Sequence, residues 1–128
     1  MLKAINPADI MPPYGGAYSR AIEVPAHARL LFVAGQVGVA RDGSVPKGIA
    51  AQSEQLWLNV LSVLREGRMT TNDIVKLNVY VQSMEDFPVF AAVRKKYLGE
   101  HKPASLGVAV ASLMDGLLVE MDVVAAAI

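Results

Sequence analysis

A single carboxylate, Glu120, stands inside the apolar run from Leu117 to Met121. A buried carboxylate without a partner is costly, so the run indicates either a polar partner or a cleft open to water. A carboxylate in a cleft can hold a water molecule and accept its proton, as a general base does. Glu120 is therefore a candidate functional residue of this chain.

Two arginines and a tyrosine are candidates for binding a ligand, and each also has a structural explanation. Arginine grips a carboxylate through two parallel hydrogen bonds, which lysine cannot do. Arg94 lies in the run Arg94-Lys95-Lys96, which is typical of the solvated face of a helix, and Arg20 is open to the same interpretation. Tyr18 stands on a predicted strand, where a packed ring with a hydrated hydroxyl group is common.

Several kinds of chemistry are excluded by the composition. The chain has no cysteine, so disulfides, thiolate catalysis and cysteine metal sites are impossible. Its histidines, His27 and His101, lie far apart with no carboxylate motif around either, so we expect no metal site. No motif for another cofactor is present, and we expect none.

The charge balance and the hydropathy of the chain limit the classes of partner that it can bind. Twelve Lys and Arg residues balance twelve Asp and Glu residues, and this lack of excess cations argues against a nucleic-acid partner. No apolar run approaches the roughly 18 residues of a membrane span, so we expect no membrane partner. The N-terminal segment has no apolar core, and Asn6-Pro7 would interrupt one, so we expect a cytoplasmic protein.

The hydrophobic pattern predicts a single α+β domain over residues 1–128 with the order ββαβαββ. Strands are expected at Tyr18–Val24 and Leu30–Ala34, as a hairpin, at Ile74–Gln82, and at Leu106–Ala111 and Leu117–Ala127 across the turn Asp115-Gly116. Helices are expected at Ile49–Glu66, capped by Gly67, and from Asp86, with Pro88 in the first turn, to about Leu98.

Two of the predicted strands, Leu30–Ala34 and Leu117–Ala127, are apolar on both faces. In a mixed sheet with both helices on one face, the helices would cover one side of these strands. The chain has no further element to cover the other side. We therefore expect it to associate with copies of itself.

The sequence resembles the RidA family, also known as the YjgF/YER057c/UK114 family and labelled endoribonuclease L-PSP. The resemblance extends from about Pro12 to Ala126 and is carried by motifs in the family's order. These motifs are Tyr18-Ser19-Arg20-Ala21, Leu31-Phe32-Val33-Ala34-Gly35-Gln36, Asp73-Ile74-Val75-Lys76, Asp86-Phe87, Phe90-Ala91-Ala92-Val93, Lys102-Pro103-Ala104 and Leu118-Val119-Glu120.

The resemblance implies a chorismate mutase-like sandwich assembled as a homotrimer, with the sheets lining a central barrel. It also implies enamine or imine hydrolysis to a 2-oxo acid and ammonia, without a cofactor, in clefts between subunits. The implied cleft residues are Tyr18, Gly35 and the water-binding Glu120. Arg20 stands where the family usually has Gln, and Arg94 where it commonly has Asn.

One departure from the family pattern concerns the arginine that binds the substrate carboxylate. Active members have Pro-Ala-Arg followed by hydroxyl or thiol residues, whereas this chain has Pro103-Ala104-Ser105-Leu106-Gly107. The resemblance therefore implies a cleft lined by Tyr18, Gly35, Ser105 and Glu120 but without the dedicated cation. We expect Ser105 and Glu120 to lie on adjacent strands joined through the turn at Asp115-Gly116.

These observations favour a homotrimeric small-molecule-binding protein with little or no 2-iminobutanoate/2-iminopropanoate deaminase activity. One alternative is a deaminase, a hydrolase acting on imines, that anchors its substrate through Arg20 or Arg94. A non-catalytic regulatory trimer is a further alternative. A ribonuclease is disfavoured, because the chain has no net positive charge and no constellation of histidines or of histidine with lysine.

Overall fold

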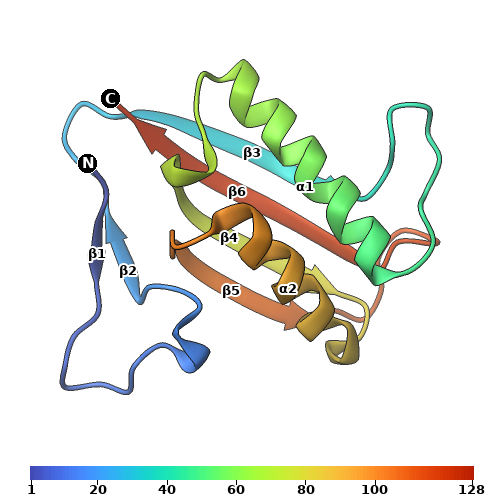
Figure 1. Cartoon of the computed structure of the whole chain (residues 1–128), viewed down its shortest axis with the longest axis horizontal. Helices are drawn as coiled ribbons and strands as arrows, with labels where there is room; N and C mark the ends of the chain where they lie inside the picture. The colour runs from blue at the N-terminus through green and yellow to red at the C-terminus, as the bar shows by residue number, and fades with distance from the viewer.

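The computed structural model describes residues 1–128 and contains six strands, two α-helices and three short 3-10 turns (Figure 1). The strands are β1 (Lys3–Ile5), β2 (Ala21–Glu23), β3 (Arg29–Val37), β4 (Ile74–Val81), β5 (Ala104–Ala109) and β6 (Val119–Ala127). The helices are α1 (Ile49–Glu66) and α2 (Phe87–Leu98), and the 3-10 turns are η1 (Tyr14–Gly16), η2 (Thr71–Asp73) and η3 (Met84–Asp86).

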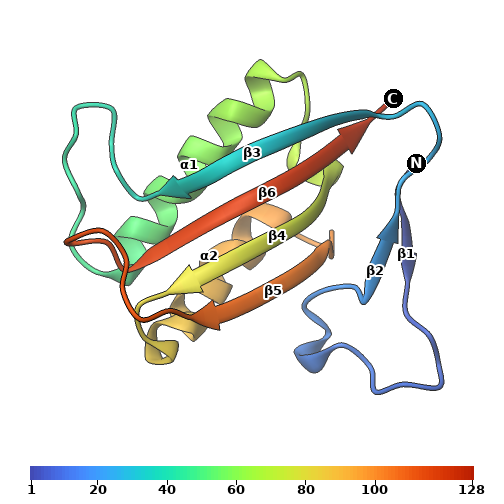
Figure 2. The same ribbon diagram turned by 180° about the vertical axis from the view of Figure 1, so that it is seen from behind.

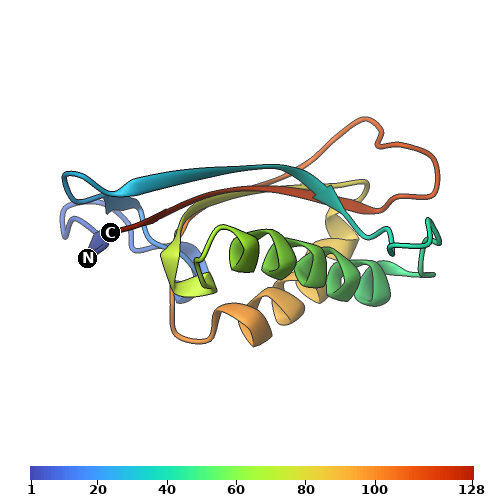
Figure 3. The same cartoon turned by 90° about the horizontal axis from the view of Figure 1, so that it is seen from above.

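The main sheet has the strand order β3-β6-β4-β5, and both helices pack on one of its faces (Figures 1 and 3). The pairs β3–β6 and β6–β4 are antiparallel, and the pair β4–β5 is parallel. A parallel pair requires a crossover connection, and α2 provides it. The predicted α+β architecture, with two helices on one face of a mixed sheet, is confirmed.

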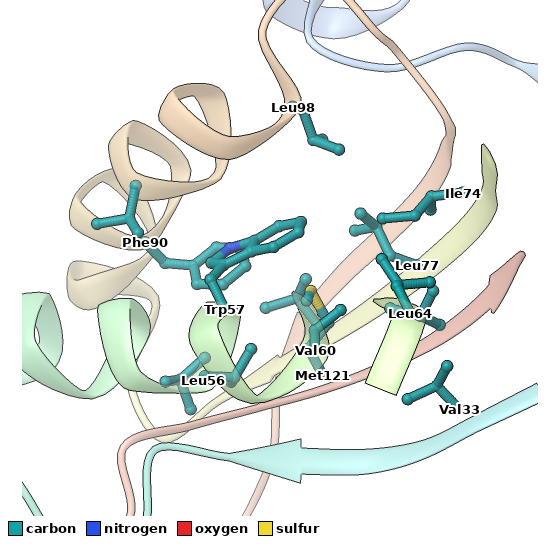
Figure 4. Close-up of a cluster of buried hydrophobic side chains, with 14 of the residues drawn as sticks. Val33, Leu56, Trp57, Val60, Leu64, Ile74, Leu77, Phe90, Leu98 and Met121 are labelled. Carbon is teal, nitrogen blue, oxygen red and sulfur yellow. The ribbon is translucent and has the colours of Figure 1, made fainter. Parts of the chain in front are cut away.

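The hydrophobic core lies between this sheet and the helices (Figure 4). Helix α1 buries Leu56, Trp57, Val60 and Leu64, which recur at helical spacing, as the sequence predicted. The ring of Trp57 stacks on Tyr97 of α2 at a centroid distance of 5.5 Å, which joins the two helices. The predicted bounds of α1 are confirmed, and the backbone N–H of its cap, Gly67, donates to the carbonyl oxygen of Val63.

Both predicted hairpins are wrong. Strand β2 pairs with the short β1, which the sequence did not predict, and this hairpin lies apart from the main sheet (Figure 2). Strand β3 pairs instead with β6, over residues Arg29–Val37 and Glu120–Ala127. Strand β6 does not pair with β5, since β4 lies between them.

The start of α2 also differs from the prediction. Asp86 makes no side-chain capping bond, and the hydroxyl of Ser83 accepts a bond from the backbone N–H of Glu85 in the preceding turn η3. Pro88 lies in the first turn of α2, as expected, where the absence of its N–H has no cost.

The face of the main sheet opposite the helices is uncovered by any other element of the chain (Figure 2). It carries Leu30, Phe32 and Leu106, and the side chain of Phe32 is 72% exposed. The predicted uncovered apolar face is therefore present in the structure. Large exposed apolar patches of this kind mark interaction surfaces.

Candidate functional site

Gly35 and Glu120 lie together on the uncovered face of the main sheet. Val119 and Met121 are buried against the helices, so the alternation of β6 directs Glu120 to the opposite face. Strand β3 has a bulge between Val33 and Gln36, where its register with β6 shifts. A Cβ atom at Gly35 would lie 3.1 Å from the Cδ of Glu120, so only glycine leaves room for this carboxyl group.

A polar cluster lies beside Glu120 on the same face. Asp122 accepts hydrogen bonds from Nδ2 of Asn78, at 2.9 Å, and from the hydroxyl of Tyr80, at 3.1 Å. Burial, the bond to Asp122 and the negative charges of Asp122 and Glu120 raise the pKa of Tyr80, so its hydroxyl stays protonated as a donor.

Asn78, Tyr80 and Asp122 are not among the residues that the sequence predicted to be functional. Two features of the sequence could have identified them. Asn78 and Tyr80 are polar positions in the alternation of Ile74–Gln82, and Asp122 follows Glu120 by two residues, so the two carboxylates share one face of a strand. These polar side chains lie on a face that is otherwise largely apolar, so the chain concentrates its polar groups next to Glu120.

Ser105 faces away from Glu120. It lies opposite Leu77 in the parallel β4–β5 pair, and Leu77 is buried in the core beneath the helices. Gly107, two residues further on, shares this face, because a Cβ there would lie 2.6 Å from Cζ of Phe87 on α2. Because β4 lies between β5 and β6, the prediction that Ser105 and Glu120 lie on adjacent strands is wrong. Within one chain, the two side chains also lie on opposite faces of the sheet.

Tyr18 lies near the strand that carries Ser105. The next residue, Ser19, forms an isolated parallel bridge with Ala104, and its backbone N–H donates to the carbonyl oxygen of Pro103 at 3.1 Å. The hydroxyl of Ser19 donates to the carbonyl oxygen of Lys102 at 2.5 Å. The predicted cleft residues thus form two groups on opposite halves of the sheet, with Gly35 on the edge strand β3, Glu120 on its neighbour β6, and Tyr18 and Ser105 at the β5 edge.

The guanidinium of Arg20 is engaged with the N-terminal segment. Its Nη2 donates to the carbonyl oxygen of Met11 at 2.7 Å, and the group lies 5.8 Å from the ring centroid of Tyr18. The backbone N–H of Arg20 donates to Oδ1 of Asn6 at 2.8 Å. These bonds hold the N-terminal segment against β2 and direct the guanidinium away from Glu120.

Arg94 is buried, in contrast to its exposed neighbours Lys95 and Lys96, so its interpretation as part of a solvated helix face is wrong. Its guanidinium lies 5.7 Å from the ring centroid of Phe87 and 5.9 Å from that of Phe90. Burial lowers the pKa of Arg94, but arginine keeps its charge at neutral pH. In one chain, therefore, neither Arg20 nor Arg94 supplies a cation beside Glu120.

Both histidines lie outside the helices and strands. His101 lies with Nε2 2.7 Å from the carbonyl oxygen of Ile74, and His27 adopts a positive φ of 66° in the loop before β3. No group of three or more His, Cys, Asp or Glu side chains is arranged to hold a metal ion. Neither helix is long and apolar enough to cross a membrane.

Comparisons with known proteins support the family resemblance that the sequence motifs indicate. The sequence profile of the endoribonuclease L-PSP family matches residues 11–127. A RutC family protein of Pyrococcus abyssi is 35% identical over 127 residues, which cover 98% of each chain. A 2-iminobutanoate/2-iminopropanoate deaminase of Mus musculus is 30% identical over 112 residues, which cover 86% of this chain and 81% of the mouse protein.

A likeness to a solved structure supports the fold. The crystal structure of YyfB from Yersinia pestis, a Rid-family protein of unknown function, superposes with a TM-score of 0.86 at 30% identity and covers 98% of both chains. The predicted chorismate mutase-like α+β fold is thus confirmed.

Proposed function

Because the chain belongs to the RidA family, also described as the endoribonuclease L-PSP family, we propose that it is a homotrimeric small-molecule-binding protein without the family's deaminase activity. Its ligand clefts lie between protomers, it needs no cofactor, and it works in the cytoplasm. The observation that carries this proposal is Ser105, an uncharged residue on β5 where active relatives have an arginine.

The positions of the cleft residues support a closed ring of protomers. Gly35 lies on the edge strand β3 with Glu120 on the neighbouring strand β6, and Tyr18 and Ser105 lie near the other edge. A head-to-tail ring brings one edge of each protomer against the opposite edge of the next, so that two incomplete sites complete each other. The same ring covers the apolar face that carries Phe32.

The loss of the arginine argues against catalysis on 2-imino acids. Their carboxylate needs a fixed cation, and removing a buried charged clamp costs about 2–5 kcal/mol, or roughly 30-fold to several thousand-fold in rate. Arg20 is already bound to backbone carbonyl oxygens. The carboxyl group of Glu120 still lies against Gly35. Compared with active relatives, the cleft therefore keeps the carboxylate that holds water and lacks the arginine that holds the substrate carboxylate.

A deaminase anchored through Arg94 is the second candidate. It is favoured over anchoring through Arg20, because Arg20 already donates to a backbone carbonyl oxygen, whereas the guanidinium of Arg94 lies near the rings of Phe87 and Phe90. The mouse relative, at 30% identity, is named as a deaminase, which gives this candidate further weight.

Two measurements test the proposal. Light scattering at micromolar concentration should give a mass of about 41 kDa, three times the 13.7 kDa of one chain, and a monomer or a dimer would contradict the ring. In a steady-state assay with 2-aminoacrylate generated in situ, the protein should show little turnover. Turnover comparable with that of an arginine-bearing relative would refute the loss of activity and favour the anchor at Arg94.

A gain-of-function variant provides the matched control. Ser105→Arg should raise turnover, whereas Ser105→Lys should raise it less, because lysine cannot grip a carboxylate with two parallel bonds. Adding Glu120→Gln to Ser105→Arg should remove the gain. If Ser105→Arg folds and gains nothing, the pocket around residue 105 has lost more than its cation.

A further inference from the structure

The side chain of Asn59, on α1, holds the last residue of β3 and the turn that follows it. Its Nδ2 donates to the carbonyl oxygens of Val37 and Val39, both at 3.0 Å. The amide nitrogen of an asparagine carries two N–H groups, so these two bonds use its full donor capacity. Because both neighbours are carbonyl oxygens, only the nitrogen end of the amide can face them. Asn59 therefore fixes two backbone positions of one short segment.

The segment that Asn59 holds is a tight turn packed directly on α1. The backbone N–H of Val39 donates to the carbonyl oxygen of Val37 at 2.9 Å, which closes a three-residue turn around Gly38. Gly38 is buried, and a Cβ atom there would lie 2.5 Å from the backbone oxygen of Gln52. The end of β3 is therefore attached to the helix by a close backbone contact and by two side-chain hydrogen bonds.

This attachment follows the bulge of β3 closely in the chain. Between Val33 and Gln36, strand β3 carries one residue more than the paired stretch of β6. The bulge leaves Gly35 on the face that carries Glu120, and a slip of one residue would turn it away. Beyond the bulge, only Gln36 and Val37 pair with β6, and β3 is an edge strand with no strand on its other side. The contact with α1 is therefore a main restraint on this end of β3.

Two glutamines of α1 complete the arrangement. Gln55, one turn before Asn59, donates through Nε2 to the Oδ1 of Asn59 at 3.0 Å and so orients its amide group. Gln52, two turns before Asn59 and on the same side of the helix, accepts through Oε1 from the backbone N–H of Leu118 at 2.8 Å. Leu118 leads into β6, two residues before Glu120. The helix thus holds both strands that meet at the cleft, β3 through Asn59 and β6 through Gln52.

We propose that Asn59 is a positioning residue of the ligand cleft, which holds the bulge of β3 so that Gly35 stays against the carboxyl group of Glu120. This role rests on the proposed function, in which Glu120 holds water in the cleft. Helix α1 approaches β3 from the covered face of the sheet (Figure 3), whereas Gly35 and Glu120 lie on the opposite face. Asn59 therefore acts on the cleft through the backbone of β3. Without its two bonds, the end of the strand is free to shift against β6.

Nuclear magnetic resonance of the assembled protein tests the effect on the backbone. In Asn59→Ala, the amide signals of Gly35 and Gln36 should broaden or split, because the strand end then exchanges between registers. Hydrogen exchange at the amide of Val39 should rise about 10-fold or more, since two bonds that hold the turn are lost. Val63→Ala is the matched control, because it removes two methyl groups packed against the core from the same helix and no hydrogen bond. It should leave the Gly35 and Gln36 signals sharp.

Steady-state kinetics test the effect on the cleft, with 2-aminoacrylate generated in situ as the probe and Ser105→Arg as the parent variant. The introduced arginine binds the carboxylate and governs KM, whereas Glu120 holds the water and governs kcat. Adding Asn59→Ala should therefore lower kcat about 10-fold and change KM less than about 3-fold. Adding Val63→Ala should change either constant less than about 2-fold.

The two measurements separate this inference from the proposed function. If the Gly35 signals change in Asn59→Ala but not in Val63→Ala, the positioning role stands even where Ser105→Arg gains no turnover, and only the explanation of position 105 fails. Unchanged signals in Asn59→Ala, or equal changes in both variants, would overturn the positioning role. An active Ser105→Arg parent whose kcat Asn59→Ala leaves unchanged would overturn it as well.

The half-buried position of Asn59 requires a check on folding. The amide spectrum of Asn59→Ala should keep the dispersion of the unmodified protein. If this variant unfolds, Gln55→Ala takes its place, because it removes only the bond that orients the amide group of Asn59. It should change the Gly35 signals in the same way and to a smaller extent. Unchanged Gly35 signals in Gln55→Ala, together with an unfolded Asn59→Ala, would count against the proposal.

Discussion

Replacing Gln52 should test how the segment leading into β6, the strand that carries Glu120, is held in place. Gln52 is a polar residue of α1 with only 2% of its surface exposed. Its Nε2 donates to the carbonyl oxygens of Pro46, at 3.1 Å, and Gly116, at 2.9 Å. Its Oε1 accepts from the backbone N–H of Leu118 at 2.8 Å, two residues before Glu120. One side chain thus ties two loops to α1.

The size of the effect follows from these three bonds. Each contributes about 1 kcal/mol of net stability, and the backbone groups left behind lie partly buried, so Gln52→Ala should lose about 3 kcal/mol. Domains of this kind have about 5–15 kcal/mol in total, so the loss is large. The midpoint of thermal unfolding should fall by roughly 10 °C for a chain of this length.

Denaturant unfolding at fixed protein concentration measures this loss, since assembly would otherwise change the apparent stability. Gln52→Met keeps the packing and removes the hydrogen bonds, so it should still lose about 2 kcal/mol. Gln55→Ala is the control on the same helix, because Gln55 bonds only to Asn59 one turn away, and it should lose about 0.5 kcal/mol or less. A Gln52→Met variant as stable as the unmodified protein would refute the reasoning.

Three further outcomes follow from the packing and the charges. Gly38→Ala should destabilise the fold by about 3 kcal/mol or prevent folding, because its Cβ would lie 2.5 Å from the backbone oxygen of Gln52, and normal stability would contradict this contact. Gly107→Ala should lose about 1–3 kcal/mol, measured by denaturant unfolding, because its Cβ would displace the ring of Phe87. Hydrogen bonds from a lysine and a tyrosine of α2 lower the pKa of Glu54 below its usual 4.5, so this carboxylate stabilises the fold above that value and less as pH falls below it. Glu54→Gln should therefore show a shallower loss of stability on acidification below pH 4.5, and an unchanged acid profile would contradict it.

The sequence by itself determined the features that depend on local pattern. The apolar spacing of α1 gave its bounds because every fourth or third residue of a helix faces the core. The alternation in β4 and the two-sided apolar character of β3 and β6 predicted a sheet with one face left uncovered. The replacement of an arginine by Ser105 is likewise visible without coordinates, because it needs only the motif around Pro103.

Only the tertiary structure decided which strands are neighbours and which faces the side chains take. The pattern of β5 and β6 fits a hairpin as well as two separate strands, and the insertion of β4 between them depends on contacts between residues far apart in the chain. The register of β4 with its two neighbours places Ser105 and Glu120 on opposite faces, because Ser105 lies opposite Leu77 and Glu120 lies opposite Tyr80. The burial of Arg94 was hidden for the same reason, since the run Arg94-Lys95-Lys96 by itself is typical of a solvated helix face, and only the packing of α2 in the tertiary structure decides which of these residues is covered.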